Sequence, residues 1–481
     1  MSARLARQDW ARYLGVSAAL LIPVYWHRRI EAGDLASHVY NAWLAQLIRQ
    51  GQAPGLWISR QWNNVLFDLL LSWLGSAFGL RAAEKAAVSL AVLTFFWGAF
   101  ALISAMTQRA PWHLSPLIAV FAYGWTFEMG FMNYYISLGL CFLALAISSD
   151  LGNAGPVISL ALIPLIWLAH PLGVICFVAL SAYATLTRAV RPRYHGYLLL
   201  AAGIFLLGVR MSLASHYELK WNGWARYFFF NGADQLALYS SRYYVLYVLF
   251  AVLFVVALGT DASSRWRKGG WWDACGTPLQ LYLATGMSSL FLPTLVKFPL
   301  YPKPLSYLTP RLSSVSGILA CWMLGTMKPR KWHVIAYVFI AAVFFTFLYI
   351  DTGILNNMEE QVERLVKALP AGHRVVSDID SREESRVVSE HIVDRACIGR
   401  CFSYDNYEPS SGMFRVRATP GNSIVETEYP NASGSQSSED LARALNPPVF
   451  LVSRCDTSAA NICMRELSAN EIHDLIEDDN K

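Results

Sequence analysis

Long apolar runs, bounded by charged or turn-forming residues, fill the first 350 residues of the chain. A helix needs about 20 mostly apolar residues to cross a bilayer, so runs of roughly 16 to 23 residues predict membrane-spanning helices. Such runs occupy 12–26, 65–80, 86–107, 114–130, 131–148, 155–169, 172–187, 195–213, 241–259, 276–296, 309–327 and 332–350. The pattern therefore predicts an α-helical polytopic membrane protein.

Basic residues beside short loops favour the cytoplasmic side and so predict the orientation. They form five clusters: Arg4/Arg7/Arg12, Arg109, Arg188/Arg191/Arg193, Arg265/Arg267/Lys268 and Lys328/Arg330/Lys331. All five are cytoplasmic only if one of the first three apolar runs does not cross. The short run 65–80 contains Asp68, so we expect an interface helix there. The prediction is about 11 transmembrane helices, a cytoplasmic N-terminus, and outer loops at 28–85, 213–240 and 297–308.

Composition and charge agree with this picture and divide the chain in two. Charged residues make up 15% of the sequence, whereas soluble chains carry about 25%. This excludes a soluble, disordered or nucleic-acid-binding protein. Residues 1–350 hold 26 Lys and Arg against 11 Asp and Glu, but residues 351–481 hold 13 against 23. We expect a transmembrane domain at 1–350 and a small, acidic, extracytoplasmic α/β domain at 351–481.

The second part alternates between helical and strand patterns. We expect helices at 359–369, 381–395, 438–446 and 468–477, and strands at 373–377, 414–418, 422–427 and 449–454. Four of the eight cysteines lie here, an even number in a compartment expected to be oxidising. The simplest pairing is Cys397 with Cys401 and Cys455 with Cys463, although spacing leaves other pairings open. A zinc site using His391 is a less favoured alternative, because paired short spacing is missing.

The first outer loop carries the main candidates for chemistry. From Asp34 onward it has helical spacing, which places Asp34 and His38 one turn apart on the same face. Asp34 is interpreted either as the N-cap of an interface helix or as a general base beside Glu31. In the second interpretation Arg28, Arg29 and His38 bind an anionic headgroup. A base and phosphate-binding cations are what sugar transfer from a lipid phosphate requires.

An acidic residue just after the first span, a long first outer loop, many further spans and an extracytoplasmic tail resemble the GT-C superfamily. These integral-membrane glycosyltransferases use polyprenyl-phosphate-linked sugars. The resemblance is one of layout, with Gly33-Asp34 and His38 as its only motif. It implies that Asp34 is the catalytic base, with Glu31 as the second candidate.

The chain departs from the GT-C pattern in its acidic residues. Many members have a paired acidic motif in the first loop, and another acidic residue in the second outer loop. Here the corresponding link, 127–135, offers only Glu128. Glu128 is interpreted either as that second acidic residue or as a carboxylate that caps a helix junction. No cofactor is predicted with certainty, and a divalent metal stays an open alternative.

Three further residues are candidates for binding a phosphate on the outer side. His170 precedes Pro171 at a tight turn, where it either binds substrate or satisfies helix-end carbonyls. Lys303 and Arg311 belong to the third outer loop and the start of the following span. They either bind phosphate or extend from the membrane toward water.

These observations predict an inverting hexosyl or pentosyl transferase at the outer face of a bacterial inner membrane. Its expected partners are a polyprenyl-phosphate sugar donor, a lipid, glycan or protein acceptor, and the bilayer, with no nucleic acid. The alternative is a non-enzymatic membrane protein, either a flippase for lipid-linked glycans or a cell-envelope assembly partner. Few ionisable residues lie within the spans, Arg210 being the main one, which argues against transport.

Overall fold

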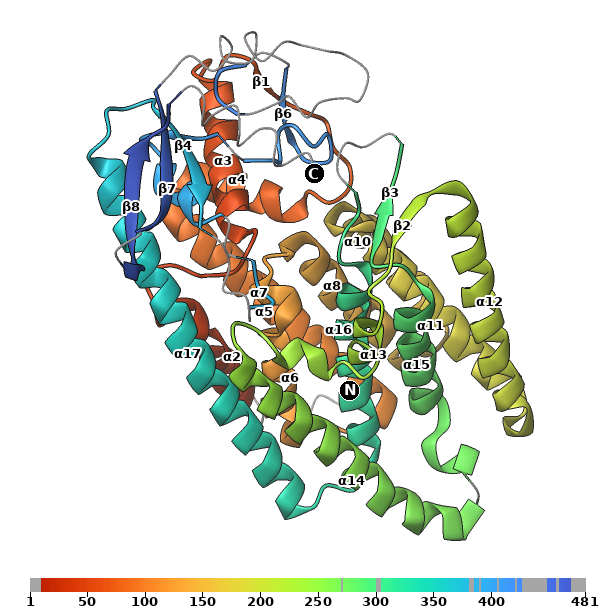
Figure 1. Cartoon of the computed structure of the whole chain (residues 1–481). Helices are drawn as coiled ribbons and strands as arrows, with labels where there is room; N and C mark the ends of the chain where they lie inside the picture. The colour runs from red at the N-terminus through yellow and green to blue at the C-terminus, as the bar shows by residue number, and fades with distance from the viewer. Residues whose placement is uncertain are drawn as a thin grey trace.

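The protein consists of a helical bundle with a smaller, sheet-containing domain at one end (Figure 1). The computed structural model describes residues 10–269, 271–299, 304–379, 385–388, 391–404, 406–419, 422–425, 448–455 and 458–468. At residues 153, 261–275 and 458–460 only the backbone is described.

Most of the described chain is helical. The α-helices up to residue 228 are α2 (Trp10–Tyr25), α3 (Leu35–Arg49), α4 (Leu66–Phe78), α5 (Leu80–Thr107), α6 (Ser115–Ala122), α7 (Trp125–Glu128), α8 (Met132–Asp150), α9 (Gly155–Leu160), α10 (Ile163–Ala169), α11 (Pro171–Ala189), α12 (His195–His216) and α13 (Ala225–Phe228). The later ones are α14 (Tyr244–Gly269), α15 (Trp271–Phe291), α16 (Leu308–Thr326), α17 (Lys331–Lys367) and α18 (Ile392–Cys397). Short 3-10 turns occur at 112–114, 152–154, 192–194, 233–236 and 241–243.

Six helices in the described part of the chain are long and apolar enough to cross a membrane. They are Leu80–Thr107, Met132–Asp150, Pro171–Ala189, Pro192–His216, Ser241–Thr260 and Lys331–Lys367. This is consistent with an integral membrane protein. The count of eleven crossings stays a prediction.

Three of the apolar runs form shorter helices than their length predicts. Run 65–80 contains the 13-residue α4, in keeping with a segment too short to span. Run 114–130 is not one helix, because the chain breaks at Gly124 between α6 and α7. Run 155–169 is divided into α9 and α10. Hydropathy reports how apolar a segment is, and it does not show where glycine and proline interrupt the helix.

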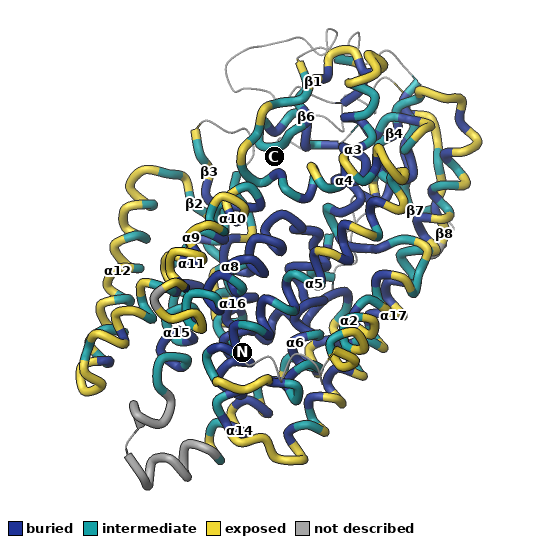
Figure 2. Tube along the Cα trace, turned by 180° about the vertical axis from the view of Figure 1, so that it is seen from behind, coloured by how far each residue is buried: buried dark blue, intermediate teal, exposed yellow. Residues whose placement is uncertain are grey.

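The core of the bundle lies where α5 crosses α8 (Figure 2). A side chain on Gly98 would meet the Gly139 carbonyl oxygen at 2.2 Å, and one on Gly139 would meet the Phe95 backbone at 2.7 Å. The two glycines therefore let the helix backbones touch, as small residues do in membrane helix pairs. Phe95 also stacks on Tyr135, with ring centroids 4.5 Å apart.

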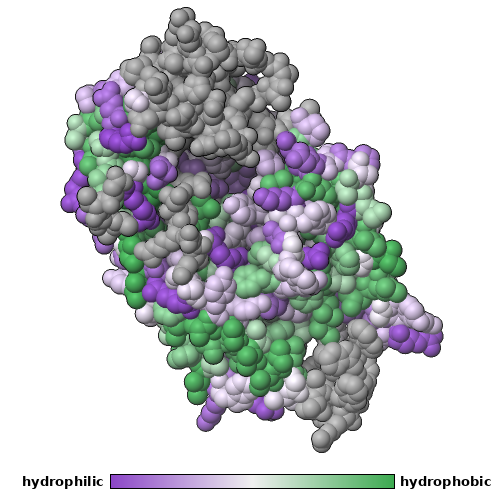
Figure 3. Space-filling view, viewed as in Figure 1, coloured by the Kyte–Doolittle hydropathy of each residue, from purple (hydrophilic) through white to green (hydrophobic). Residues whose placement is uncertain are grey.

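The bundle has an apolar surface band between its two polar ends. In Figure 3 apolar residues cover α12 and the lower part of α17, and hydrophilic residues return at the lower tips of these two helices. The Arg109 guanidinium, just after α5, contacts the Gly325 and Met327 carbonyls at the end of α16. Helix α17 begins after Arg330 at this same end and rises to the small domain (Figure 1). The basic loops around Arg109 and Arg330 thus lie opposite the small domain.

Helix α17 joins the two parts of the protein without a break. It runs from Lys331 to Lys367, so the amphipathic helix expected at 359–369 is the continuation of the last apolar run. The helix expected there is confirmed up to Lys367, and it is continuous with the preceding span. The apolar segment of α17 packs on α6 and α14, and its last turns pack on α18 and β8.

The small domain contains a four-stranded sheet in the order β5-β4-β7-β8. Its strands are β4 (Arg374–Asp378), β5 (Phe402–Ser403), β7 (Val449–Cys455) and β8 (Ser458–Glu466), with only the β7–β8 pair antiparallel. The strands expected at 373–377 and 449–454 are confirmed, and β8 was not expected. Of the helix expected at 381–395, the described residues 385–388 are not helical and α18 forms its last part, and residues 422–425 contain no strand. Helices 438–446 and 468–477 lie outside the described residues, except that 468 is described and not helical.

Two further strand pairs connect distant segments. Strand β6 (Val416–Ala418), within the expected strand 414–418, pairs antiparallel with β1 (Leu56–Ile58), which lies between α3 and α4. Strand β2 (Glu218–Lys220) pairs with β3 (Leu295–Lys297), which joins the segment after α12 to the segment after α15. The first of these pairs ties the small domain to the membrane part through backbone hydrogen bonds.

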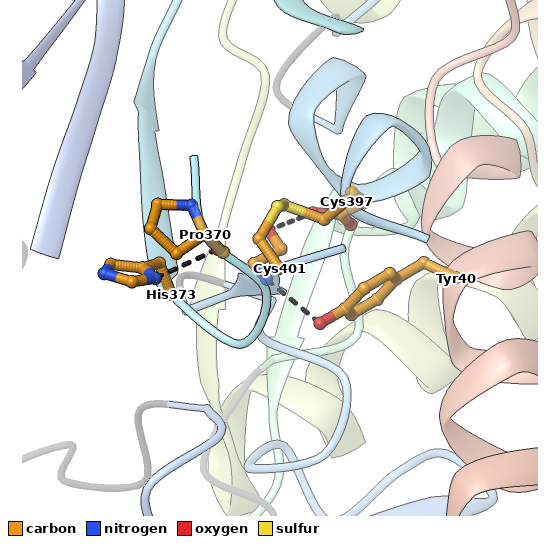
Figure 4. Close-up of a disulfide and its surroundings, with 7 residues drawn as sticks. Tyr40, Pro370, His373, Cys397 and Cys401 are labelled. Carbon is orange, nitrogen blue, oxygen red and sulfur yellow. Dashed lines mark hydrogen bonds between the residues drawn. A yellow bond between two sulfur atoms is a disulfide. The ribbon is translucent and has the colours of Figure 1, made fainter. Parts of the chain in front are cut away.

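Both simplest disulfides are confirmed. The S–S distances are 2.01 Å for Cys397–Cys401 and 1.97 Å for Cys455–Cys463. Figure 4 shows the first disulfide with Tyr40 extending toward its segment from α3. The Ser403 N–H donates to the Tyr40 hydroxyl at 2.9 Å. Cys141, Cys176 and Cys321 are free and buried.

Candidate functional site

A cavity of about 300 Å³ lies where the small domain meets the helix bundle. Its walls come from both parts of the protein. The membrane part contributes Asp34, His38, Asn64, Met129, Phe131, Asn133, Tyr134, His170, Pro304, Leu305, Ser306, Tyr307 and Arg311, and the small domain contributes Val388, His391, Tyr407, Ser411, Met413 and Phe414. The cavity thus brings together four of the residues predicted from sequence: Asp34, His38, His170 and Arg311.

Asp34 is held in this cavity by backbone contacts. Its N–H donates to the Met129 carbonyl at 3.0 Å, so the first outer loop docks on the link between α7 and α8. A side chain on Gly33 would meet that carbonyl oxygen at 2.4 Å, and one on Gly130 would meet the Asp34 and Leu35 nitrogens at 2.5 Å. Gly33 and Gly130, with φ of +21° and +76°, are therefore needed for this close approach.

The Asp34 carboxylate does not cap the helix that follows it. Asp34 precedes the first residue of α3, but its side chain makes no capping hydrogen bond. It is 20% exposed and lines the cavity. The structure therefore disagrees with the N-cap interpretation.

Replacement of Gly130 by alanine is expected to destabilise the fold and displace Asp34. Overpacking costs roughly 1–3 kcal/mol, and the left-handed backbone adds strain. The matched control is Gly51→Ala, which has a similar φ of +70° but nothing within 4 Å of a new side chain. Thermal unfolding should show the larger loss for Gly130→Ala. Equal losses would mean that the close approach is unimportant.

Arg311 supplies a cation without a hydrogen-bonding partner. Its guanidinium lies over the Phe131 ring at 4.0 Å, and the Tyr134 hydroxyl donates to its backbone carbonyl at 2.9 Å. Its Nε is buried and unpartnered, and no described carboxylate forms an ion pair with it. Both Asp34 and Arg311 line the cavity. An anion in the cavity would provide the guanidinium with acceptors.

His38 supplies a second cation. Its Nδ1 lies 2.8 Å from Asp68 Oδ1, and Glu408 of the small domain is 3.9 Å away. Burial alone would lower the pKa of His38, but these carboxylates, Asp68 foremost, raise it to about 9. His38 is therefore charged at neutral pH. No described residue hydrogen-bonds its Nε2, and the residue lines the cavity.

Asp68 and Glu408 are themselves fixed by buried amides and hydroxyls. Asn133 donates to Asp68 at 2.9 Å, and Ser37 and Asn41 donate to Glu408 at 2.9 and 2.8 Å. Burial raises the pKa of Glu408 to about 7, although the nearby charge of His38 lowers it. This network holds the small domain against α3.

The His38 ion pair makes stability depend on pH. The folded pKa of about 9 lies above the unfolded value of 6.5, so this stabilisation is complete below about pH 6.5 and is lost as pH rises through about 9. We expect the free energy of unfolding to fall over that interval, and the fall to be smaller in His38→Gln. Denaturant titrations of both proteins at several pH values measure it. Identical pH dependence in the two proteins would contradict the assignment.

His170 is a neutral member of the cavity wall. Its Nδ1 accepts a hydrogen bond from the Leu172 N–H at 3.1 Å and so caps α11. Burial, with a smaller effect from Arg311, lowers the pKa of His170 to about 3. Its ring meets the Tyr134 ring with centroids 5.5 Å apart. The ring therefore caps the start of α11 by accepting an N–H, instead of satisfying helix-end carbonyls as expected, and it also lines the cavity.

The remaining predicted residues lie outside this cavity. Glu31 Oε2 is 3.4 Å from Arg395 in a buried ion cluster, and burial followed by the charge of Glu359 raises the pKa of Glu31 well above its usual range. Arg29 pairs with Glu359 and Glu363 of α17. Arg28 pairs with Glu360 and Glu363 of the same helix.

The last two predicted site residues are Glu128 and Lys303. Glu128 is buried and accepts a hydrogen bond from the Tyr239 hydroxyl at 2.6 Å, which matches its interpretation as a carboxylate at a helix junction. Lys303 lies outside the described residues.

Sequence reasoning missed the contribution of the small domain. His391 lies 3.6 Å from Asp34 and Tyr407 shares the cavity wall, yet both were far away in the sequence. The sequence shows them only as a lone histidine and one aromatic residue in an acidic tail, a pattern too weak to predict a site. Asp68 did carry a signal, because a charge in an apolar helix is rare.

Within the described residues no group of three or more His, Cys, Asp or Glu side chains is placed to hold a metal ion. No family model matches the chain, and no curated protein or solved structure matches it either. The functional argument therefore depends on the cavity itself.

Proposed function

We propose that the protein is an inverting glycosyltransferase of the GT-C type, which transfers a sugar from a polyprenyl phosphate to a hydroxyl acceptor. The observation that carries the proposal is the cavity in which the Asp34 carboxylate meets two cations, Arg311 and His38, that lack partners on the cavity side. A base and two anion-binding groups in one cavity suit the loss of a phosphate leaving group.

In the proposed reaction Asp34 takes the proton of the acceptor hydroxyl. The hydroxyl oxygen forms a bond to the anomeric carbon from the side opposite the phosphate. The bond between that carbon and the phosphate oxygen breaks, and its electron pair leaves with the polyprenyl phosphate. Arg311 and His38 stabilise the charge that develops on the phosphate.

The walls of the cavity suit a sugar attached to a lipid. The lining includes five aromatic side chains, a residue type on which sugars stack: Phe131, Tyr134, Tyr307, Tyr407 and Phe414. The cavity lies between the apolar helices and the small domain, so a lipid chain in the membrane and a sugar above it can be bound together. This placement supports a donor that is carried by the bilayer.

The proposed location is the bacterial inner membrane, with the N-terminus in the cytoplasm and the small domain outside. Two disulfides in the small domain favour an oxidising compartment. The basic loops around Arg109 and Arg330 at the opposite end favour the cytoplasmic side. The acceptor is a lipid, a glycan or a protein with a free hydroxyl.

The proposal is tested with the purified full-length protein in lipid vesicles. Undecaprenyl phosphate carrying radiolabelled hexoses or pentoses is added with a membrane lipid extract as the acceptor source. Time-dependent release of undecaprenyl phosphate and labelling of an acceptor are expected. Donor binding without release, for every sugar tested, would contradict the enzyme and favour the flippase or assembly alternative.

A further inference from the structure

The contact between His391 and Asp34 connects the small domain directly to the proposed base. We propose that His391 is a positioning residue, which favours the ionised form of Asp34 and holds its carboxylate at the cavity. The catalytic role of His391 rests on the proposed function. The electrostatic coupling between the His391 and Asp34 side chains does not depend on that function.

Asp394 orients the His391 ring, because it contacts the ring nitrogen that does not face Asp34. His391 Nδ1 lies 3.1 Å from Asp394 Oδ2, and Nε2 lies 3.6 Å from Asp34 Oδ1. Both carboxylates favour a doubly protonated imidazole, in which Nδ1–H donates to Asp394 and Nε2–H points toward Asp34. Asp394 is 1% exposed and accepts a second hydrogen bond from the Ser403 hydroxyl. The ring therefore has a fixed direction, because both of its nitrogens face carboxylates.

The backbone that carries His391 is also held firmly. Helix α18 begins at the next residue, and Arg395 on that helix forms ion pairs with Glu31, Glu84 and Glu359. These partners come from the first outer loop, α5 and α17. The Tyr407 ring packs against His391 with centroids 5.5 Å apart. An imidazole in this position cannot turn away from Asp34 without breaking several buried contacts.

Several charges act on Asp34, and His391 is in ion-pair contact with it at 3.6 Å. Groups that face Asp34 or His391 electrostatically are His38, Arg311, Tyr407, Glu408 and Asp394. A proton on His391 Nε2 faces the carboxylate at short range and favours its negative charge. After Asp34 has taken the acceptor proton, the same contact favours its return to the ionised form. The small domain is then part of the site rather than a separate module.

The test uses the protonation state of Asp34 itself. Dicyclohexylcarbodiimide adds to protonated carboxyl groups, and peptide mass spectrometry measures the modified fraction of Asp34 at each pH. In His391→Gln, the pH of half-maximal modification is expected to rise by about one unit, a tenfold change in the protonation equilibrium. If this variant does not fold, His391→Asn serves the same purpose. Identical modification profiles in the wild type and the folded variant would overturn the proposal.

A matched control and an activity assay separate the possible failures. His170→Gln changes another histidine of the same cavity that contacts no described carboxylate within 4 Å, so it should leave the Asp34 profile unchanged. An equal shift in both variants would overturn the specific role of His391. If no polyprenyl-phosphate sugar is consumed by the wild type, the proposed function fails. The modification profile still shows whether His391 favours the ionised form of Asp34. If transfer occurs, its acidic limb should move upward with the modification profile.

Discussion

Replacement of Asp34 by asparagine is expected to lower the rate of sugar transfer by roughly 10²–10⁴-fold, the usual contribution of a general base. Asparagine keeps the size and polarity of the side chain but cannot accept the acceptor proton. The backbone contact between the Asp34 N–H and the Met129 carbonyl is retained. Because the side chain makes no capping hydrogen bond, stability should change little. Release of undecaprenyl phosphate by the folded variant measures the effect.

The matched control for this experiment is Glu31→Gln in the same loop. Glu31 lies in the buried cluster around Arg395 and does not line the cavity. Its raised pKa favours the neutral acid, which glutamine resembles. Transfer by Glu31→Gln should stay close to the wild-type rate. A folded Asp34→Asn protein with unchanged turnover would refute the catalytic role, and loss in Glu31→Gln alone would transfer that role to Glu31.

Replacement of Arg395 by methionine is expected to have the largest effect on stability, a loss of about 3–5 kcal/mol. Arg395 is the shared partner of Glu31, Glu84 and Glu359, all of which are buried. Methionine fills part of the space but leaves these buried acidic side chains in a desolvated site with fewer cations. Denaturant-induced unfolding of the vesicle-free protein, followed by tryptophan fluorescence, measures the loss.

Two comparisons make the Arg395 prediction specific. Arg28→Met removes a cation that is 44% exposed and paired at 3.4 Å or more, so its loss should stay below about 1 kcal/mol. The effect of Arg395→Met should also shrink at low pH, because protonation removes the uncompensated charges. A loss as small as that of Arg28→Met would show that the cluster does not hold the domains together.

Much of the membrane architecture is a local property of the sequence. The apolar runs that form α5, α8, α11 and α12 were expected with nearly the observed bounds, because an uninterrupted apolar segment is both a good helix and a poor solute in water. The runs that form α14 and α17 were also expected, but both helices extend well beyond the apolar part. The disulfides were also predictable, since close spacing favours Cys397 with Cys401 and Cys455 with Cys463. Runs 114–130 and 155–169 were misjudged, because their helices are interrupted within apolar sequence.

The candidate site was only partly predictable. Asp34 and His38 were found because they share one helical face, a relation fixed by spacing. Arg28 and Arg29 were expected at the same site, but the acidic last turns of α17 pair with them instead. The sequence places Glu359 and Glu363 in the second part of the chain and gives no sign that α17 returns to the first loop.

By itself, the sequence determined the apolar helices, the division of charge between two parts, and a first outer loop with an acid and a histidine. The tertiary structure alone decided which charges meet. Asp34 faces His391 across most of the chain. Asn41 donates a hydrogen bond to Glu408, which is 367 residues away in the sequence. Hydropathy and helical spacing act over a few turns of chain. A cavity between domains is instead set by the packing of segments whose separation no local pattern encodes.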